Sequence, residues 1–600
     1  MNMSDAYRFV TLIGVCGYRK CVLFSLLLMV SLNVSDALSK DLEQHRLNVD
    51  NINASTLSGL IDRYSGKPYV NFNAFVLDLY ITGKRFFSEE QHVAIGEFVV
   101  NEPISQSESL VVHRLLGVYT RLKYGGEARR MLGRLVSVPS VRQFGVAQHE
   151  NRQFIRLEKM IRAYAKEFGL KYKIVKGSVY EVSLPGRRGG ALIGLHAHAD
   201  VAAVDDELWV LDNGTKMDPF RMTQVGDRLY GRGTQSAKNA IVVSMMAMRT
   251  IKEEGIHLLN DFKLLIDTSG INSRSAIPDY LKKQVAPDYN ITLDGSYPVV
   301  IAEKGAATLL ARFPVLRTTE SHGIGDIIGL VGGTAANQML VAPKAIIRSD
   351  VPQQLIQKIE ELSLGFVASH GGDFSVTAKV AGDTVVLEVT GVSASVNPLP
   401  RLLMFIRQMT ASQLLNENHF TWAAAYVADN IGLDRYGAGL GIGFEHEFMG
   451  PLTAVLTKAR LNEEDLELLV DLRIPQGEPI ARIESVLLDK LRQWQTAAYS
   501  TIVFEFEADE PMYRNPKRRV FNVMLDIAVE NLDLPREFSS SSNSTSIHTL
   551  PNGIQFGLSL PNEQDITQGA TEFKTIDQLL LDIQIVTEMM MGVGLMRNLK

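Results

Sequence analysis

Apolar segments that end in polar loops constrain the fold of this chain most tightly. Residues 191–201 (ALIGLHAHADV) and 262–270 (FKLLIDTSG) each have the pattern of a buried strand that enters a loop. Between them, residues 238–255 (KNAIVVSMMAMRTIKEEG) form a long apolar helical segment that ends at a glycine. Alternation of strands and helices predicts an α/β fold with a mostly parallel central sheet and helices on both faces.

The middle of the chain has a different pattern. Segments such as FSVTAKVAG (374–382) and DTVVLEVTGV (383–392) alternate apolar and polar residues, which is typical of half-exposed antiparallel strands. We therefore predict an inserted α+β lid or dimerisation domain at 308–506, and one α/β domain assembled from 126–307 and 507–600. Residues 38–125 are predicted to form a helical N-terminal extension.

The first 37 residues have the layout of a secretory signal. Tyr18-Arg19-Lys20 precedes the apolar run VLFSLLLMVSL (22–32), which is too short to span a bilayer as a helix. Cleavage near Leu38 would give an exported protein, periplasmic or secreted; the alternative is an uncleaved N-terminal membrane anchor. Both cysteines, Cys16 and Cys21, lie in this leader, so we expect no disulfides in the exported chain.

The overall charge excludes one class of partner. The 600 residues carry a net charge of -6 at pH 7, which argues against nucleic acid as the main partner. An apolar fraction of 46% is that of an ordinary globular protein.

Polar side chains occur in the loops that directly follow the predicted strands, and sheets of this kind bind their ligands there. The carboxyl ends of parallel strands meet at one edge of the sheet, which makes the loops after them candidate sites. The candidates are His196, His198, Asp200, Asp267 and Asp294. A His-x-Asp pair suits zinc, because the imidazole ligates the ion and the carboxylate orients a ligand. Loop residues satisfied by the backbone are the alternative reading of the same pattern.

The order of these segments along the chain resembles that of a known family, although no single segment is specific to it. LHAHADV, DRLYGRGTQSAKNA, LLIDTSG, LDGSYPVVIAEKG, VTGVSASVNPLP, LPNGIQFGLSLPNEQ and TEFKTIDQLL occur in the order found in the co-catalytic zinc peptidases. Over about 130–600 the chain resembles this metallopeptidase family twenty, which includes aminoacylases, carnosinases and bacterial dipeptidases. The resemblance implies a two-zinc site that hydrolyses dipeptides or amino-acyl amides.

The resemblance also implies a role for each site position. It places a metal-ligating His at His198, its helper at Asp200, a zinc-ligating Asp at Asp294 and the general base at Asp267. Three further ligand positions hold residues that are poor zinc ligands, namely Ser236, Thr268 and Gln568. Two substrate-binding positions are also substituted, a lid His by Ser395 and a carboxylate-binding Arg by His548.

Two hypotheses about function follow. With only His198 and Asp294 left of five metal ligands, the first is a non-catalytic homologue that binds a peptide, a small amino-acyl ligand or a partner, as monomer or homodimer, without a cofactor. The second is an active dipeptidase with one weakly held zinc ion, for which Asp267 supplies a third ligand. In either case, carboxylates crowded together without the metal charge should include one whose pKa is raised.

Overall fold

The computed structural model describes residues 49–599 except 144, 176–177, 212, 272–275, 317–322, 333–341, 394–395, 496–498, 562–568 and 570. The leader, Ser395 and Gln568 lie outside the described residues, so the predictions made for them stay predictions. None of the helices in the described ranges combines the length and the apolar character needed to cross a membrane.

A nine-stranded sheet forms the centre of the first domain. Its strand order is β1-β2-β6-β3-β7-β22-β9-β20, and β21 pairs with β9. The central strands β6, β3, β7 and β22 run parallel, whereas β1, β2 and β20 pair antiparallel. The bounds are β1 Lys171–Val175, β2 Val179–Leu184, β3 Leu192–His198, β6 Asp261–Asp267, β7 Tyr289–Thr292, β9 Val300–Glu303, β20 Met512–Tyr513, β21 Ser539–Ser541 and β22 Gly553–Gln555.

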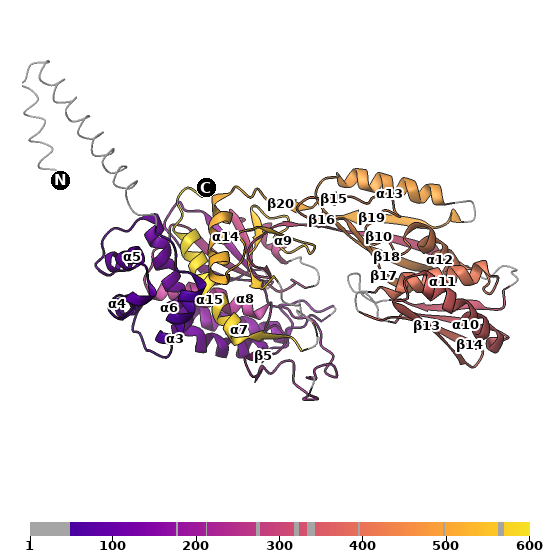
Figure 1. Cartoon of the computed structure of the whole chain (residues 1–600), viewed down its shortest axis with the longest axis horizontal. Helices are drawn as coiled ribbons and strands as arrows, with labels where there is room; N and C mark the ends of the chain where they lie inside the picture. The colour runs from indigo at the N-terminus through magenta and orange to yellow at the C-terminus, as the bar shows by residue number, and fades with distance from the viewer. Residues whose placement is uncertain are drawn as a thin grey trace, which may run out of the picture.

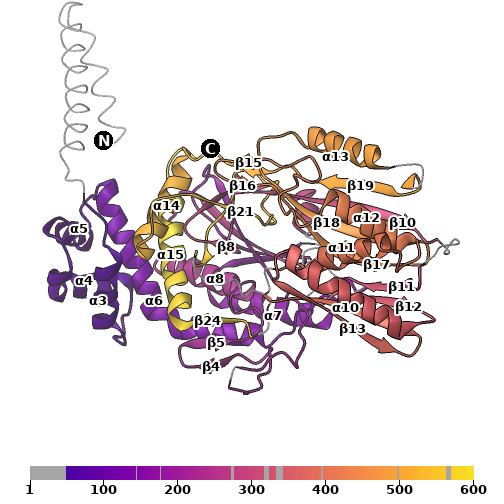
Figure 2. The same cartoon turned by 45° about the vertical axis from the view of Figure 1, so that its right-hand side comes forward.

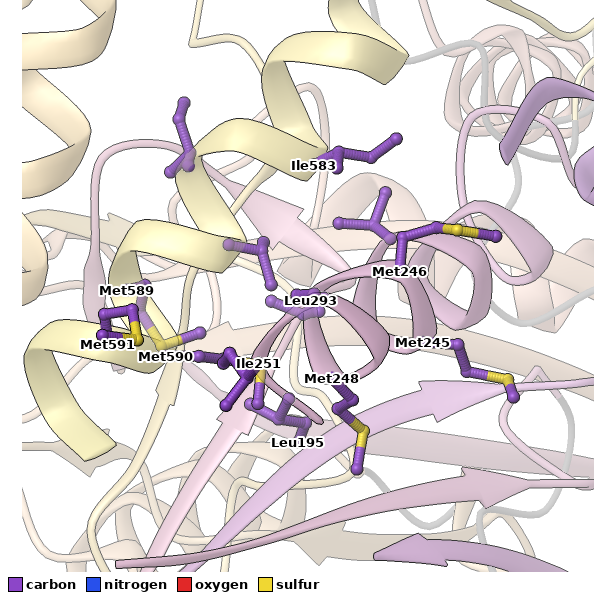
Figure 3. Packing of buried hydrophobic residues seen from close by; sticks show 14 of the residues in the cluster. Leu195, Met245, Met246, Met248, Ile251, Leu293, Ile583, Met589, Met590 and Met591 are labelled. Carbon is purple, nitrogen blue, oxygen red and sulfur yellow. The ribbon is translucent and has the colours of Figure 1, made fainter. Parts of the chain in front are cut away.

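Helices cover both faces of this sheet, as predicted. Leu264 of β6 packs into the large core beneath α8 and α15, and its neighbour Leu265 packs on the other face with Ile277 of α9. Figure 3 shows methionines of α8 and α15 in the same hydrophobic core as Leu195 of β3. The helices of this domain are α7 Arg152–Glu167, α8 Lys238–Glu253, α9 Ala276–Leu281, α14 Arg519–Leu532 and α15 Ile576–Gly594.

The N-terminal residues form helices, as predicted, but they are not a separate unit. The 31-residue α6 continues past the predicted boundary at 125 and packs along α15 (Figure 1). A Cβ at Gly117 would lie 2.6 Å from the carbonyl oxygen of Gln584, so the two helices meet almost backbone to backbone. The helices are α3 Ala54–Tyr64, α4 Phe72–Thr82, η2 Lys84–Phe86, α5 Glu89–Val99 and α6 Gln106–Val136.

The inserted domain has its own hydrophobic core and lies at the opposite end from the N-terminal helices (Figures 1 and 2). It contains two antiparallel four-stranded sheets, β17-β18-β10-β19 and β11-β12-β14-β13. The predicted boundaries at 308 and 506 fall inside its first and last strands. Its elements are β10 Gly305–Pro314, β11 Asp326–Val331, β12 Lys344–Arg348, α10 Pro352–Ser369, β13 Phe374–Ala381, β14 Thr384–Gly391, α11 Pro398–Ala411, α12 His419–Asn430, β17 Thr453–Leu461, β18 Asp465–Ile474, α13 Ile480–Trp494 and β19 Val503–Ala508.

Short strand pairs complete the structure. They are β4 Thr223–Val225, β5 Arg228–Tyr230 and β24 Phe573–Thr575 in one sheet, β8 Gly295–Ser296 with β23 Leu558–Ser559, and β15 Glu445–His446 with β16 Gly450–Pro451.

Candidate functional site

Three of the predicted site residues meet at the carboxyl ends of β3, β6 and β7. His198 ends β3 directly beside Asp267 at the end of β6, because the two strands pair in parallel register. Asp294 follows β7, the neighbour of β3 on the other side. They share a pocket of about 40 Å³, room for a few water molecules. The residues that line it include His198, Asp267, Gly270, Thr292, Asp294 and Thr545.

His198 forms the centre of a small charge network. Its Nδ1 donates to the backbone carbonyl of Asp200 at 2.9 Å and lies 3.2 Å from that residue's Oδ1. Its Nε2 lies 3.5 Å from Asp294 Oδ2. Burial alone would lower the pKa of His198, but the charge of Asp294 and the hydrogen bonds with both acids hold it well above 6.5. The imidazole is therefore positively charged at neutral pH and pairs with Asp294.

Asp200 connects His198 to the loop after β6. Its carboxylate is fully buried, and it accepts hydrogen bonds from the backbone N–H of Gly270 at 2.9 Å and of Ile271 at 3.0 Å. These hydrogen bonds hold Asp200 beside the imidazole of His198 and outside the pocket. This is the position of a residue that orients a metal ligand.

One carboxylate oxygen of Asp267 has no hydrogen-bond partner among the described residues. Its Oδ1 accepts from the backbone N–H of Ser269 at 2.6 Å and from its hydroxyl at 2.9 Å. Its Oδ2 is buried, and the described residues provide no hydrogen bond to it. Burial raises the pKa of Asp267; the hydrogen bonds from Ser269 oppose this, and the charge of Asp200 adds to it. The expected raised pKa is therefore found, but desolvation rather than repulsion is its main cause.

The loop after β6 differs from the prediction at Thr268. The resemblance placed Thr268 at a ligand position, but its hydroxyl donates to the carbonyl of Ser178 at 2.7 Å, outside the pocket. The residue of this loop that faces His198 is Gly270, where an added Cβ would lie 2.5 Å from the Cβ of His198. Threonine points away because its hydroxyl satisfies the backbone of the β1–β2 turn.

The glycine-rich turn before α8 is held by a buried acid. Glu572 accepts from Arg232 Nη1 at 3.1 Å and from the backbone N–H of Gln235 at 3.0 Å. Ala237, the N-cap residue of α8, has a φ of 48°, which is rare for a residue with a Cβ. Ser236 is buried in this turn and is not among the residues that line the pocket. The turn thus keeps its structural role without a carboxylate at 236.

Lys238 does not balance the charge of the site acids. Its side chain is fully buried, and its Nζ donates to the carbonyl of Val138 at 2.6 Å. Burial lowers its pKa to about 7, and the charge of Glu572 opposes that shift. His198 supplies the positive charge beside the acids instead.

His548, predicted at a substrate-binding position, makes its contacts within the protein. Its Nδ1 lies 2.8 Å from Glu303 Oε2, and its Nε2 lies 2.6 Å from the carbonyl of Glu510. Glu303 is fully buried at the end of β9 and also accepts from Thr545 and Gln555. Burial lowers the pKa of His548, but the hydrogen bonds to Glu303 and to the carbonyl of Glu510, together with the charges of Glu303 and Asp509, outweigh it and raise the pKa above 6.5.

Sequence reasoning missed part of the surroundings of the site. Thr292 and Thr545 line the pocket, and Glu303 and Glu572 organise the loops around it. The signal for Glu303 was present, because an acid inside the apolar run VVIAE needs a buried partner. His196, by contrast, bonds to Asn290 at 2.9 Å and does not line the pocket.

Comparisons with known proteins agree with this architecture. The family model "Peptidase family M20/M25/M40" matches residues 194–591, more than half of the chain. The Beta-Ala-Xaa dipeptidase of Lactobacillus delbrueckii subsp. lactis is 25% identical over 411 residues, which cover 67% of this chain and 81% of that protein. Human carnosine dipeptidase 1 has the same fold, with a TM-score of 0.50 and 10% identity over 81% of this chain and 99% of its own. The chain therefore belongs to peptidase family M20/M25/M40, as its sequence motifs indicated.

Proposed function

We propose that this protein binds a dipeptide-like ligand in the manner of its dipeptidase relatives but does not hydrolyse it at a two-zinc centre. One observation carries the proposal. The imidazole of His198, which would ligate zinc in the family, is paired with the carboxylate of Asp294, the other retained ligand position. The pairing occupies both groups within the chain, while Ser236 and the backbone-bonded hydroxyl of Thr268 are poor zinc ligands.

The residues around this pair do not fit a zinc pair. Two zinc ions bring four positive charges, and zinc takes histidine, cysteine or carboxylate ligands. Ser236 offers a neutral hydroxyl, and the hydroxyl of Thr268 is bonded to the backbone. Within the described ranges, no group of three or more His, Cys, Asp or Glu side chains is placed to share a metal ion.

The choice of ligand follows from the relatives. A protein named Beta-Ala-Xaa dipeptidase covers two thirds of this chain, so short peptides are the class to test first. The pocket of about 40 Å³ has room for one end group of such a peptide, and the carboxylate of Asp294 can pair there with its amine.

A one-zinc dipeptidase is the second candidate, and one observation favours it. Asp267 Oδ2 is buried at the pocket without a hydrogen bond from the described residues, which is the state of a carboxylate oxygen that has room for a ligand. Such a site would hold one ion between His198 and Asp294, with Asp267 as the third ligand.

Zinc analysis and a hydrolysis assay separate the two candidates. The full chain is saturated with zinc and desalted, and its zinc content is measured by elemental mass spectrometry. Samples are then incubated with β-Ala-containing dipeptides to detect hydrolysis. The binding of the same dipeptides is measured by calorimetry. We expect far less than one zinc per chain, saturable binding of the intact dipeptide and no free amino acids. Asp294→Asn is the test variant, and Asp205→Asn, an exposed acid of the loop after β3, is the matched control.

One zinc per chain together with hydrolysis that Asp294→Asn abolishes and Asp205→Asn retains would establish the enzyme instead. If no dipeptide binds and none is cleaved, the peptide-binding role is wrong.

A further inference from the structure

The outer side of the N-terminal helices α4 and α5 exposes large apolar side chains. Leu77, Tyr80 and Ile81 lie within about one turn of each other on α4. Val93 lies on α5, and Val100 is the C-cap residue of the same helix. Ile81 is 68% exposed, Val100 65% and Val93 51%. These five residues are called the α4–α5 surface below.

Tyr80 connects the two helices. Its ring stacks on that of His92 of α5, with the ring centroids 4.6 Å apart. A Cβ at Gly96 would lie 2.8 Å from the Tyr80 ring, so the tyrosine covers this part of α5. Val93, Gly96 and Val100 are spaced three and four residues apart and therefore share one face of the helix. The exposed apolar side chains of α4 thus continue onto α5.

The helix α4 is apolar on both its inner and its outer side. Leu79 is fully buried in the core, whereas Leu77 and Ile81 face solvent. The neighbouring helix α3 has the usual pattern, since it exposes Ser58 and Asp62. A helix that is hydrophobic all round is normally covered on both sides, and an exposed apolar patch marks a contact with another molecule or a membrane.

The leader joins the folded chain beside this surface. Val49 is buried, and the carbonyl of Asp50 accepts a hydrogen bond from Gln91 Nε2 of α5 at 2.8 Å. Residues 33–48 separate this point from the apolar run 22–32, and a chain of that length spans at most about 55 Å. Because an apolar run favours lipid over water, it would hold the N-terminal helices near a bilayer and leave the inserted domain at the far end (Figure 1).

The charged side chains next to the surface have both signs. Lys84 and Arg85 of η2 and Glu89 and Glu90 at the start of α5 are exposed in the connection between α4 and α5. Two bases and two acids provide no net attraction to an anionic surface. The apolar side chains therefore determine which surface binds, together with a tyrosine ring of the kind found at the boundary between lipid and water.

We propose that the α4–α5 surface lies on a zwitterionic lipid bilayer, beside the leader. The helix α4 has 11 residues and is too short to cross a bilayer, so the contact is peripheral and lies at the level of the lipid headgroups. None of the five residues lines the pocket at His198, so the contact does not depend on the proposed function.

A single fluorescent label tests the contact. In the full chain, Cys16 and Cys21 are replaced by Ser, and nitrobenzoxadiazole is attached through Ile81→Cys. The matched control carries the label through Leu364→Cys on α10 of the inserted domain, where the side chain is 78% exposed. With phosphatidylcholine vesicles, emission of the label at 81 should rise about twofold or more and shift to shorter wavelength, because the label leaves water. Emission of the label at 364 should stay constant.

Substitutions on the two faces separate this contact from general attachment of the chain. All labelled chains carry the same leader, so a difference between them reports where the bilayer is touched. Leu77→Glu, added to the Ile81→Cys chain, places a charge on the surface and should remove most of the rise. Ser58→Glu, on the polar side of α3, should leave it unchanged. A salt concentration of about 0.5 M should also leave it unchanged, because salt screens charges and not apolar contacts.

Contrary results are equally specific. The proposal is overturned if the label at 81 responds no more than the label at 364, or if Leu77→Glu responds like its parent. It is also overturned if the rise requires anionic phosphatidylglycerol. A rise with protein concentration alone, without vesicles, would assign the surface to a second copy of this chain instead. Val93→Cys provides the label position on α5 if Ile81→Cys does not fold.

Discussion

Alanine substitutions at two glycines of α6 should have opposite effects on stability. Gly117 faces α15, and a Cβ there would lie 2.6 Å from the carbonyl oxygen of Gln584 and 3.3 Å from its carbonyl carbon. Gly126 lies on the exposed side of the same helix, where a Cβ would meet only the end of the Arg130 side chain, at 3.8 Å. The chemical change is identical, so the difference measures the packing of α6 on α15.

The magnitude follows from two opposing effects. Alanine is favoured over glycine in a helix interior by about 1 kcal/mol, which applies to both positions. Overpacking costs about 1–3 kcal/mol, and the contact at Gly117 falls on helix backbone that cannot rotate away, so we take the upper value. Gly117→Ala should therefore lower the free energy of unfolding by about 2 kcal/mol, and Gly126→Ala should raise it by about 1 kcal/mol.

Urea denaturation followed by circular dichroism gives both values, with the parent chain as reference. Equal stability of the two variants would refute the close approach of α6 and α15, and with it the account of how the N-terminal helices join the domain. A Gly117→Ala variant that is more stable than the parent would also refute this close approach.

Two further predictions concern buried ion pairs. His548→Ala leaves the buried Glu303 without its cation and should cost about 3–5 kcal/mol in urea denaturation. Because the pKa of His548 is raised on folding, the contribution of its charge is complete below about pH 6.5 and is lost as pH rises through the folded value, so the difference in stability between parent and variant should narrow at alkaline pH; a constant difference up to pH 10 would contradict the pairing. On α6, Arg114→Met breaks a buried pair with Glu588 and should cost a similar 3–5 kcal/mol. Arg121→Met, whose partner is exposed, should cost less than about 1 kcal/mol, and thermal denaturation that ranks the two the other way would contradict this assignment.

Much of the site could be predicted from sequence because it depends on local pattern. An apolar strand ending in LHAHAD places His198 at the carboxyl end of a parallel strand, where the matching end of FKLLID supplies Asp267. The raised pKa of a buried acid was likewise predictable, since crowding and burial shift it in the same direction.

Other features could not be predicted, because they depend on contacts between distant segments. Whether Thr268 or Gly270 faces His198 depends on the carbonyl of Ser178, which takes the threonine hydroxyl. The partner of His548 is an acid 245 positions away in sequence.

By itself, the sequence determined the alternation of strands and helices and the inserted antiparallel domain, because periodicity is a local property. Only the tertiary structure decided that His198 pairs with Asp294 and that α6 joins the α/β domain at Gly117. It alone also formed the cavity where the N-terminal helices meet α15. Hydrogen bonds and close packing between segments depend on distances of a few tenths of an ångström, and the order of residues along the chain does not specify those distances.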